Sequence, residues 1–462
     1  LKVNELDLNT ENMERLIKLE DKSTETVIGE IDRDGFLLSN FGPVQDIPTI
    51  SPQKFQNRTR FKIELVVING YIGIKKHYLG NNLSFLNELR ALHQLGLTGC
   101  NVPALMKMDF DNLILIFSYI AGWVLREKLA QAGAILRDRD VNNNPDFTCL
   151  TEKKRTRKRI AEGRRVLYNV INHQFVEDVF EQFRKIHDSK FIHGVKYGNI
   201  IIEKTTGKPY LIDFELSSYF PNLGKNSFRI IRDKDIEQFN LHFGTETLTY
   251  RKIKEKVKKA NHEEIYAPVY FGGGIRLGNV WNMVAGYGRW NYILKDNLPA
   301  LSGKRILTLG ANNAHNSIQM LRRGAREVIG IELDCANIEQ GNFVKSGFEW
   351  ADNTKYNFRY CHANMRELQQ LNLGKFDMVM ALCSIYYLDD ASIADLVQYI
   401  SKITDTFILQ CNLARDIGRN DSYTYTKASL DYALKILRQN GFINNDIIAP
   451  RNYTRPLIIA RS

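Results

Sequence analysis

The pattern of apolar and polar positions divides the 462-residue chain into two parts with different periods. Residues 25–80 alternate apolar and polar positions between turn signals, and the Asn69-Gly70 pair predicts a β-hairpin. Helical spacing follows in "NLSFLNELRALHQLG" and recurs from about residue 124 to 188. From residue 304 onward, apolar runs such as "KRILTLG" and "EVIGIEL" alternate with helical segments, which predicts βαβ units around a parallel sheet.

These patterns predict two domains and a connection. We expect an α+β amino-terminal domain over residues 1–245, a linker and basic segment over 246–284, and an α/β Rossmann-like carboxy-terminal domain over 285–462. Within the connection, Pro268 and the run of glycines at 272–274 indicate a linker or a flexible loop.

Composition excludes few classes of protein, but the distribution of charge is informative. Six cysteines without C-x-x-C pairs argue against a zinc site and suit a reducing cytoplasm, and no apolar run reaches the length of a membrane span. Residues 152–165 and 251–259 are strongly basic, and their combined charge equals the net charge of the whole chain, +11. These two basic patches suit an anionic membrane surface, a polyanionic substrate or RNA, and the alternative is two solvated helix faces.

Two segments, "FIHGVKYGNIII" (191–202) and "PYLIDFE" (209–215), are similar to the catalytic loop and the metal loop of a protein-kinase fold. In that pattern an aspartate follows His193 by two residues and an asparagine follows the aspartate by five. Here Val195 takes the place of the aspartate and Asn199 comes one residue early. The base that would accept the proton of the acceptor hydroxyl is therefore missing.

Residues 25–220 resemble a kinase-like domain of the lipopolysaccharide-kinase and small-molecule-kinase type. The resemblance implies ATP and Mg²⁺ as cofactors, with this set of residues: Lys75 on the strand "GYIGIKK" for the phosphates (Lys76 as fallback), Glu88 as partner of the lysine, Asn199 and Asp213 as metal ligands, and His193 in the catalytic loop. No glycine-rich loop precedes the lysine strand. With the base missing as well, we expect weak or absent phosphotransfer, the alternative being a kinase that uses another base.

The segment "KRILTLGANNAHNSIQMLRRGAREVIGIELD" resembles the start of a class I S-adenosylmethionine (SAM) methyltransferase. The first strand ends in a turn at Gly310, and the second ends at Glu332, whose carboxylate would accept hydrogen bonds from both ribose hydroxyls. The resemblance implies SAM as cofactor, bound by Gly310, Asn312, Asn313, Glu332 and Asn364, and an active-site mouth at Tyr386 and Tyr387.

The methyltransferase pattern is also incomplete. Thr308 stands where an acid is expected, and Asn312 and Ala314 replace glycines, although Asn tolerates a left-handed backbone better than most residues. A Rossmann-like oxidoreductase is the competing interpretation, and the absence of G-x-G-x-x-G disfavours it.

Together the two halves resemble the bifunctional kinase-methyltransferases that end bacterial O-antigen chains, with the domain order reversed. That resemblance implies a glycan or glycolipid acceptor, and a cytoplasmic protein that lies at the inner face of the membrane. Two alternatives remain open: an RNA (tRNA-like) methyltransferase that binds RNA through its basic patches, and a non-catalytic scaffold in which both domains are degenerate.

Overall fold

The computed structural model describes residues 25–31, 37–38, 61–68, 71–136, 142, 150–194, 196–279, 287–411, 427–449 and 455–462. The chain forms two compact units, Leu1–Thr249 and Tyr250–Ser462, here called the first and the second unit. Asn69, Gly70 and Val195, on which the sequence predictions drew, lie outside the described residues.

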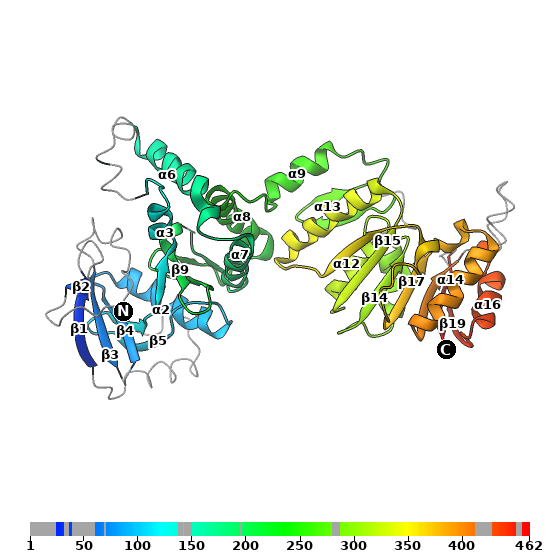
Figure 1. The fold of residues 1–462 in the computed structure, drawn as a ribbon, viewed down its shortest axis with the longest axis horizontal. Helices are drawn as coiled ribbons and strands as arrows, with labels where there is room; N and C mark the ends of the chain where they lie inside the picture. The colour runs from blue at the N-terminus through cyan, green and yellow to red at the C-terminus, as the bar shows by residue number, and fades with distance from the viewer. Residues whose placement is uncertain are drawn as a thin grey trace. The chain divides into compact units, whose positions relative to one another are not determined.

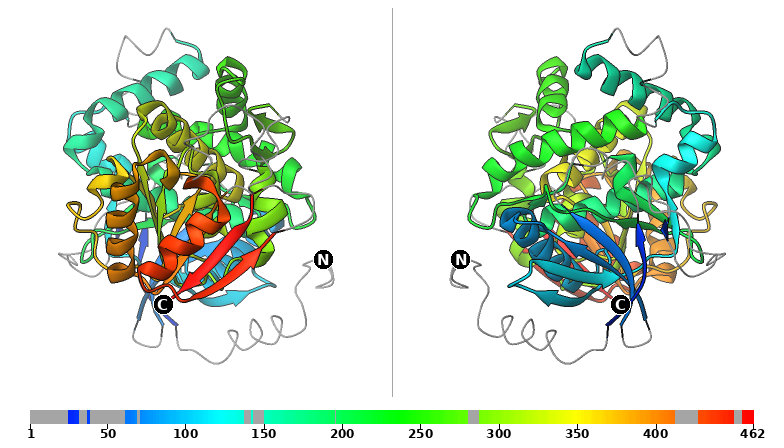
Figure 2. Two further views of the ribbon diagram at one scale, coloured as in Figure 1. Left: turned by 90° about the vertical axis from the view of Figure 1, so that its right-hand side faces the viewer. Right: turned by 90° about the vertical axis from the view of Figure 1, so that its left-hand side faces the viewer.

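The first unit begins with an antiparallel six-stranded sheet in the order β2-β1-β3-β4-β6-β5 (Figure 1). Its strands are β1 (Glu25–Ile31), β2 (Leu37–Leu38), β3 (Lys62–Ile68), β4 (Tyr71–His77), β5 (Leu105–Asp109) and β6 (Ile114–Ser118). Helix α2 (Asn82–Leu97) connects β4 to β5, is capped by Asn81 and buries Phe85 and Leu89. The right-hand view of Figure 2 shows this blue helix beside the strands. The pairing of β3 with β4 agrees with the predicted hairpin.

The rest of the first unit is mainly helical. Its elements are β7 (Gly122–Val124), α3 (Leu125–Gln131), α6 (Glu152–Val166), η3 (Leu167–Asn169), α7 (His173–Asp188), β8 (Phe191–Ile192), η4 (Tyr197–Asn199), β9 (Ile200–Glu203), β10 (Pro209–Leu211), β11 (Ser218–Tyr219) and α8 (Lys225–Phe243). Helix α7 repeats apolar residues at helical spacing, so one of its faces is buried. There Phe183 packs against Phe239 of α8 with ring centroids 5.6 Å apart, and this core supports the loops between β8 and β11.

The second unit is a doubly wound α/β unit whose seven-stranded sheet has the order β16-β15-β14-β17-β18-β20-β19. The strands are β14 (Arg305–Leu309), β15 (Glu327–Glu332), β16 (Phe358–His362), β17 (Met378–Leu382), β18 (Thr406–Gln410), β19 (Asn444–Ile448) and β20 (Leu457–Arg461). The first five strands in this order are parallel, which confirms the predicted parallel sheet, and β20 is antiparallel to both of its neighbours.

Helices cover both faces of this sheet. Figure 1 shows α12 (His315–Arg322) and α13 (Cys335–Asp352) on one side, and α14 (Asp390–Ile403) and α16 (Leu430–Gln439) on the other. The left-hand view of Figure 2 looks onto α14 in orange and α16 in red. Shorter elements are α10 (Tyr287–Arg289), the π-helix η5 (Trp290–Leu294), α11 (Lys295–Asn297), η6 (Met365–Glu367) and η7 (Ile385–Tyr387). Because β14 lies between β15 and β17, the chain changes direction across the sheet at β14, and ligands bind at such a point.

The prediction of a linker over 246–284 is wrong for much of that segment. Residues 250–278 form helix α9 (Tyr250–Lys259) and a hairpin of β12 (Val269–Gly272) and β13 (Ile275–Leu277), and they belong to the second unit. Phe271 packs on Phe348 of α13 with ring centroids 5.4 Å apart. The three glycines at 272–274 have φ values of 86°, 62° and 78°, so they make the tight turn of the hairpin instead of a flexible loop.

Both basic patches lie largely on helices. The patch 152–165 lies on α6, where Ile160, Gly163 and Val166 are buried, and the patch 251–259 lies on α9, where Ile253 and Val257 are buried. Each helix therefore packs one face and presents Lys and Arg on the other. Across the described ranges, no helix combines the length and the apolar character that a membrane span requires.

Candidate functional site

The lysine that the first unit buries is Lys76 and not Lys75, so the prediction for Lys75 is wrong by one residue. Successive side chains of a strand point to opposite faces. On β4, Lys75 faces Glu64 of β3 at 3.7 Å, whereas Lys76 is 5% exposed and its Nζ donates to Glu88 Oε2 at 2.6 Å. The sequence motif does not distinguish the two adjacent lysines. The pleat of the strand does, because it turns one side chain toward the interior and the other away from it.

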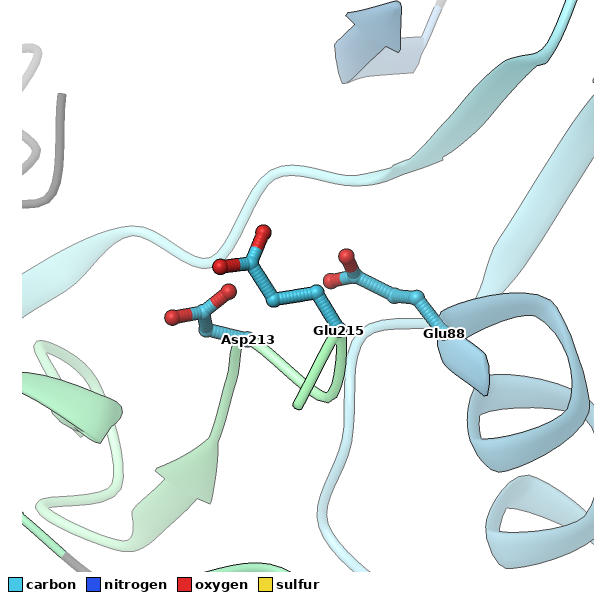
Figure 3. A group of neighbouring side chains, drawn as sticks. All are labelled: Glu88, Asp213 and Glu215. Carbon is cyan, nitrogen blue, oxygen red and sulfur yellow. The ribbon is translucent and has the colours of Figure 1, made fainter. Parts of the chain in front are cut away.

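Lys76 lies among three carboxylates that two distant segments supply. Besides Glu88 from α2, its Nζ lies 3.2 Å from Glu215 and 3.4 Å from Asp213, both in the loop after β10. Figure 3 shows that the carboxyl groups of Glu88, Asp213 and Glu215 lie close to one another. Burial alone would lower the pKa of Lys76, but the three carboxylates raise it, so the ammonium stays charged. Burial, together with Asp213 and Glu88, raises the pKa of Glu215.

This cluster has the donors that a divalent cation needs. The carboxylate oxygens of Glu88, Asp213 and Glu215 lie within 4.8 Å of one another, and three carboxylates exceed the single charge of Lys76. Asn199 is buried, and among the described residues its Oδ1 has no hydrogen-bond partner, so this oxygen is available as a ligand. The backbone joins the two segments, because the N–H of Ile212 donates to the carbonyl of Asn199 at 2.9 Å. These oxygen donors fit Mg²⁺.

An apolar pocket extends from this cluster. Lys76, Glu88, Asp213 and Glu215 line its polar end, and apolar side chains from β3, β4, β6 and β9 line the remainder, among them Ile63, Ile74, Phe117 and Ile201. An apolar pocket with charged groups at one end suits a flat aromatic ligand that carries phosphates.

His193, predicted as a catalytic residue, occupies a packing position. Its ring stacks on Phe214 with centroids 4.2 Å apart, and it is absent from the described residues that line the pocket. The backbone N–H groups of His193 and Gly194 donate to the carboxylate of Asp235, which also lies 3.1 Å from His187 Nε2. Asp235 thus fixes the loop, a role that the sequence did not indicate.

In the second unit, the turn after β14 has the backbone that the sequence predicted. Gly310, Asn312 and Ala314 have φ values of 67°, 49° and 60°, so the chain is left-handed at alternate positions. A Cβ at Gly310 would lie 2.8 Å from the Cβ of Ser384, so only glycine fits there. The N–H groups of Gly310 and Ala311 donate to the carbonyl of Ile331, which ties the turn to the end of β15.

Glu332 ends β15 with its carboxylate held by backbone groups. Oε2 accepts from the N–H of Asn312 at 2.7 Å, and Oε1 accepts from the N–H groups of Leu333 and Asp334 at 3.0 Å each. The hydroxyl of Tyr360 donates to the carbonyl of Asn312 at 2.6 Å, and burial, with Glu332 nearby, raises the pKa of Tyr360. The acid therefore lies in a fixed orientation beside the turn. The backbone takes three of its roughly four lone-pair sites, so about one remains, on Oε2, for a hydroxyl of a ligand.

The same turn lines a pocket that contains three residues missed in the sequence analysis. Arg289, His315 and Tyr266 line it together with Thr308 and Asn312. Arg289 is 5% exposed, so the pocket places a buried guanidinium beside the turn. Burial lowers the pKa of His315 to about 4, with Arg322 and Arg289 adding repulsion, so His315 is neutral at neutral pH.

The remaining predicted SAM-binding residues have structural partners. Asn313 uses Nδ2 to donate to the carbonyl of Ala267 at 2.8 Å, so its side chain holds the segment that precedes β12. Asn364 caps η6, where its Oδ1 accepts from the N–H of Arg366 at 3.0 Å. Thr308, found in place of an acid, lies 3.2 Å from the hydroxyl of Ser317. The side chains of Asn313 and Asn364 thus shape the site, and their contact with a cofactor stays a prediction.

The two tyrosines of the predicted mouth differ in environment. Tyr387 is 74% exposed, whereas Tyr386 is buried against Cys383 and Ala428, and burial raises its pKa. Arg455 lies nearby and donates from Nη1 to the hydroxyl of Tyr266 at 3.1 Å. The hydroxyl of Ser384, which begins the loop, donates to the carbonyl of Leu309, so the tyrosines follow a segment anchored to β14.

Two of the missed residues share one reason. Arg289 and Tyr266 lie far from the turn at Gly310 in sequence and belong to no motif. The fold brings both to the pocket that this turn lines.

Comparisons with known proteins give distant likenesses only. No family model matches the sequence, and no curated protein matches it. The amino-terminal domain of EvdMO1, crystallised with SAH and D-fucose, is 18% identical, with a TM-score of 0.33 over 47% of this chain and 98% of its own. A putative S-adenosylmethionine-dependent methyltransferase from Listeria monocytogenes is 17% identical, with a TM-score of 0.31 over 38% of this chain and 98% of its own.

The bifunctional kinase-methyltransferase WbdD is 15% identical, with a TM-score of 0.28 over 34% of this chain and 34% of its own. Solved structures that resemble the chain thus include S-adenosylmethionine-dependent methyltransferases. Because all these scores lie below 0.5, the geometry of the chain itself must support any activity.

Proposed function

We propose that the second unit is a SAM-dependent methyltransferase. The observation that supports this most is the carboxylate of Glu332, fixed by three backbone N–H groups beside the turn at Gly310. A carboxylate at the end of the strand next to β14 is suited to a ribose hydroxyl, since the lone-pair site that the backbone leaves open accepts a charge-assisted hydrogen bond. The left-handed turn lets a ligand approach the backbone closely.

The neighbouring residues fit the amino-acid end of the same cofactor. Arg289 is a buried guanidinium in the pocket, and a guanidinium binds a carboxylate with two parallel hydrogen bonds. It would hold the ligand although Thr308 has replaced the expected acid. Bound there, SAM would supply an electrophilic methyl group. The protein must then align the acceptor with this methyl group. Tyr386 and Tyr387 are proposed to line the entrance through which the acceptor reaches it.

For the first unit we propose a kinase-like nucleotide site with weak or absent phosphotransfer. Lys76 would bind phosphates, and Asn199 and Asp213 would hold Mg²⁺, which would neutralise phosphate charge. The ion pair of Lys76 with Glu88 and the orphan oxygen of Asn199 support this proposal. The sequence places no aspartate between Gly194 and Val195, so the usual base is missing.

The proposed acceptor is a bacterial surface glycan or its phosphorylated precursor, handled at the inner face of the membrane. This part rests on the sequence resemblance to O-antigen-terminating enzymes with reversed domain order. The exposed Lys and Arg of α6 and α9 are suited to an anionic membrane surface or an anionic substrate.

Methyl-labelled SAM tests the function directly. We would incubate the full chain with separate lipid, glycan and RNA fractions, with and without ATP, and locate the label by mass spectrometry. Label in the glycan or glycolipid fraction supports the proposal. Label confined to RNA would instead establish the RNA alternative, and absence of transfer together with absence of SAM and Mg-ATP binding would indicate the scaffold.

A further inference from the structure

The first unit contains a second pocket, whose lining is cationic. Its walls come from four elements: Arg126 of α3, Thr156 and Arg159 of α6, Lys196 and Gly198 in and beside η4, and His242 near the end of α8. We call it the basic pocket. Among the described residues that line it, three are Lys or Arg and none is acidic. The proposed nucleotide and methyl-donor sites do not account for it.

The packing around the basic pocket is specific. Helix α6 approaches η4 at Gly163, where a Cβ would lie 2.6 Å from the ring of Tyr197, so only glycine permits this distance. The hydroxyl of Tyr197 donates to the carbonyl of His242, which joins η4 to the end of α8. Burial, followed by repulsion from Lys196, lowers the pKa of His242, so its ring adds a polar wall without adding charge near neutral pH.

Gly198, beside Arg126, connects the basic pocket to the proposed nucleotide pocket. The Nε and Nη2 of Arg126 donate to the carbonyl of Leu136 at 3.2 and 2.7 Å, which fixes the plane of the guanidinium. A Cβ at Gly198 would lie 3.6 Å from Cδ and 3.9 Å from Nη1 of Arg126. Gly198 lines both pockets, so a molecule in the basic pocket lies next to a ligand in the nucleotide pocket.

We infer that the basic pocket binds the phosphate or carboxylate group of an anionic small molecule. Cationic groups from three different elements converge on one cavity, and such convergence recognises a compact anion better than a flat basic surface does. Arg159 lies on the strongly basic helix α6. Part of the positive charge of this helix therefore lines a defined pocket instead of facing solvent. If the nucleotide site proposed above is correct, this anionic molecule would be the phosphoryl acceptor of the first unit. The inference of an anion site does not depend on the nucleotide site.

Glucose 6-phosphate, glucuronate and glucose are the probes, titrated calorimetrically into the full chain at low ionic strength. The first two separate a phosphate from a carboxylate ligand, and neutral glucose controls for the sugar. The variants are Arg159→Gln and Lys196→Gln, with Arg157→Gln as matched control, because Arg157 is exposed on the same helix and does not line the pocket. Lys196 is exposed, so its substitution leaves folding intact.

We expect one or both anions to bind, glucose not to bind, and each pocket variant to weaken binding at least about tenfold, while Arg157→Gln changes it less than about twofold. ADP binding, measured separately, should not change in Arg159→Gln. Equal weakening by Arg157→Gln would overturn the site in favour of a diffuse basic surface. Loss of anion binding on addition of ADP would place the anion in the nucleotide pocket and also overturn it. A chain that binds the anion but not ADP would contradict the proposed nucleotide site and leave the anion site supported.

Discussion

Lys75 and Lys76 are neighbours of the same type, yet they have opposite environments. Lys75 faces a partner at 3.7 Å on the more exposed face, and Lys76 is buried among three carboxylates. Removing one partner of a buried ion pair leaves charge uncompensated and typically costs about 3–5 kcal/mol. The pair of Lys75 with Glu64 is longer and only partly buried, so its loss should cost less.

We therefore expect Lys76→Met to destabilise the first unit by several times more than Lys75→Met. Hydrogen exchange of the amides of β4 and α2 measures this in the intact chain, because it reports on that unit alone. Equal protection in the two variants would contradict the assignment of Lys76 as the buried lysine.

His315 gives a prediction for the dependence of stability on pH. Its pKa is about 4 in the folded chain and 6.5 in the absence of burial. Between these values the unfolded chain binds a proton that the folded chain does not bind, so stability falls as the pH falls through this window, by up to about 3 kcal/mol. A His315→Gln variant lacks this contribution. Its urea midpoint should vary less between pH 6.5 and 4 than that of the wild type, and parallel curves would refute the burial of a neutral imidazole.

For single residues, the sequence predicted site positions where these lie at the end of a regular strand. Gly310 and Glu332 were predictable because Gly310 directly follows β14 and Glu332 is the last residue of β15, both strands of the parallel sheet. The choice between Lys75 and Lys76 depended on the pleat of one strand. Arg289 and Tyr266 depended on tertiary packing, for which the local pattern contains no signal.

At the scale of elements, the β12–β13 hairpin is the feature that the sequence analysis misjudged. Three consecutive glycines resemble a linker, but here they form the turn of a hairpin whose Phe271 lies over α13. Close packing requires Gly347, because a Cβ there would lie 2.3 Å from Cε1 of Phe271. The segment just before β12 also supplies Tyr266 and Ala267 to the pocket beside Gly310.

The Gly347→Ala variant tests this role of the hairpin. The added methyl group must displace Phe271, which we expect to cost about 1–3 kcal/mol and to weaken SAM binding, since the hairpin shifts relative to Asn313. Ser346→Ala is the matched control, because Ser346 is the half-buried neighbour on α13 and its hydroxyl donates to the carbonyl of Asn342 in its own helix. A variant with wild-type unfolding and wild-type SAM affinity would show that the hairpin does not support the site.

At the scale of the whole molecule, alternation of strands and helices was enough to predict the second unit, because each βαβ step repeats a strong local signal. The first unit is harder to predict, since its strands are mostly short and its loops define the site. The joint between the units at Thr249 and Tyr250 also differs from the predicted linker, because α9 and the hairpin carry apolar residues that pack within the second unit. The two basic patches did not indicate the domain boundary, because α6 and α9 each expose charged residues on one face and pack apolar residues on the other.

The central claim is that the carboxylate of Glu332 binds the ribose of a methyl donor. Calorimetric titration of the full chain with S-adenosylhomocysteine tests it most directly, with Glu332→Gln and, as matched control, Glu327→Gln at the opposite end of β15, where Glu327 pairs with Arg305. A hydrogen bond to a charged group contributes about 1.5–3 kcal/mol. We therefore expect Glu332→Gln to weaken binding at least about tenfold and Glu327→Gln to change it less than about twofold. Wild-type affinity in Glu332→Gln, or no binding by the wild-type chain, would contradict the claim.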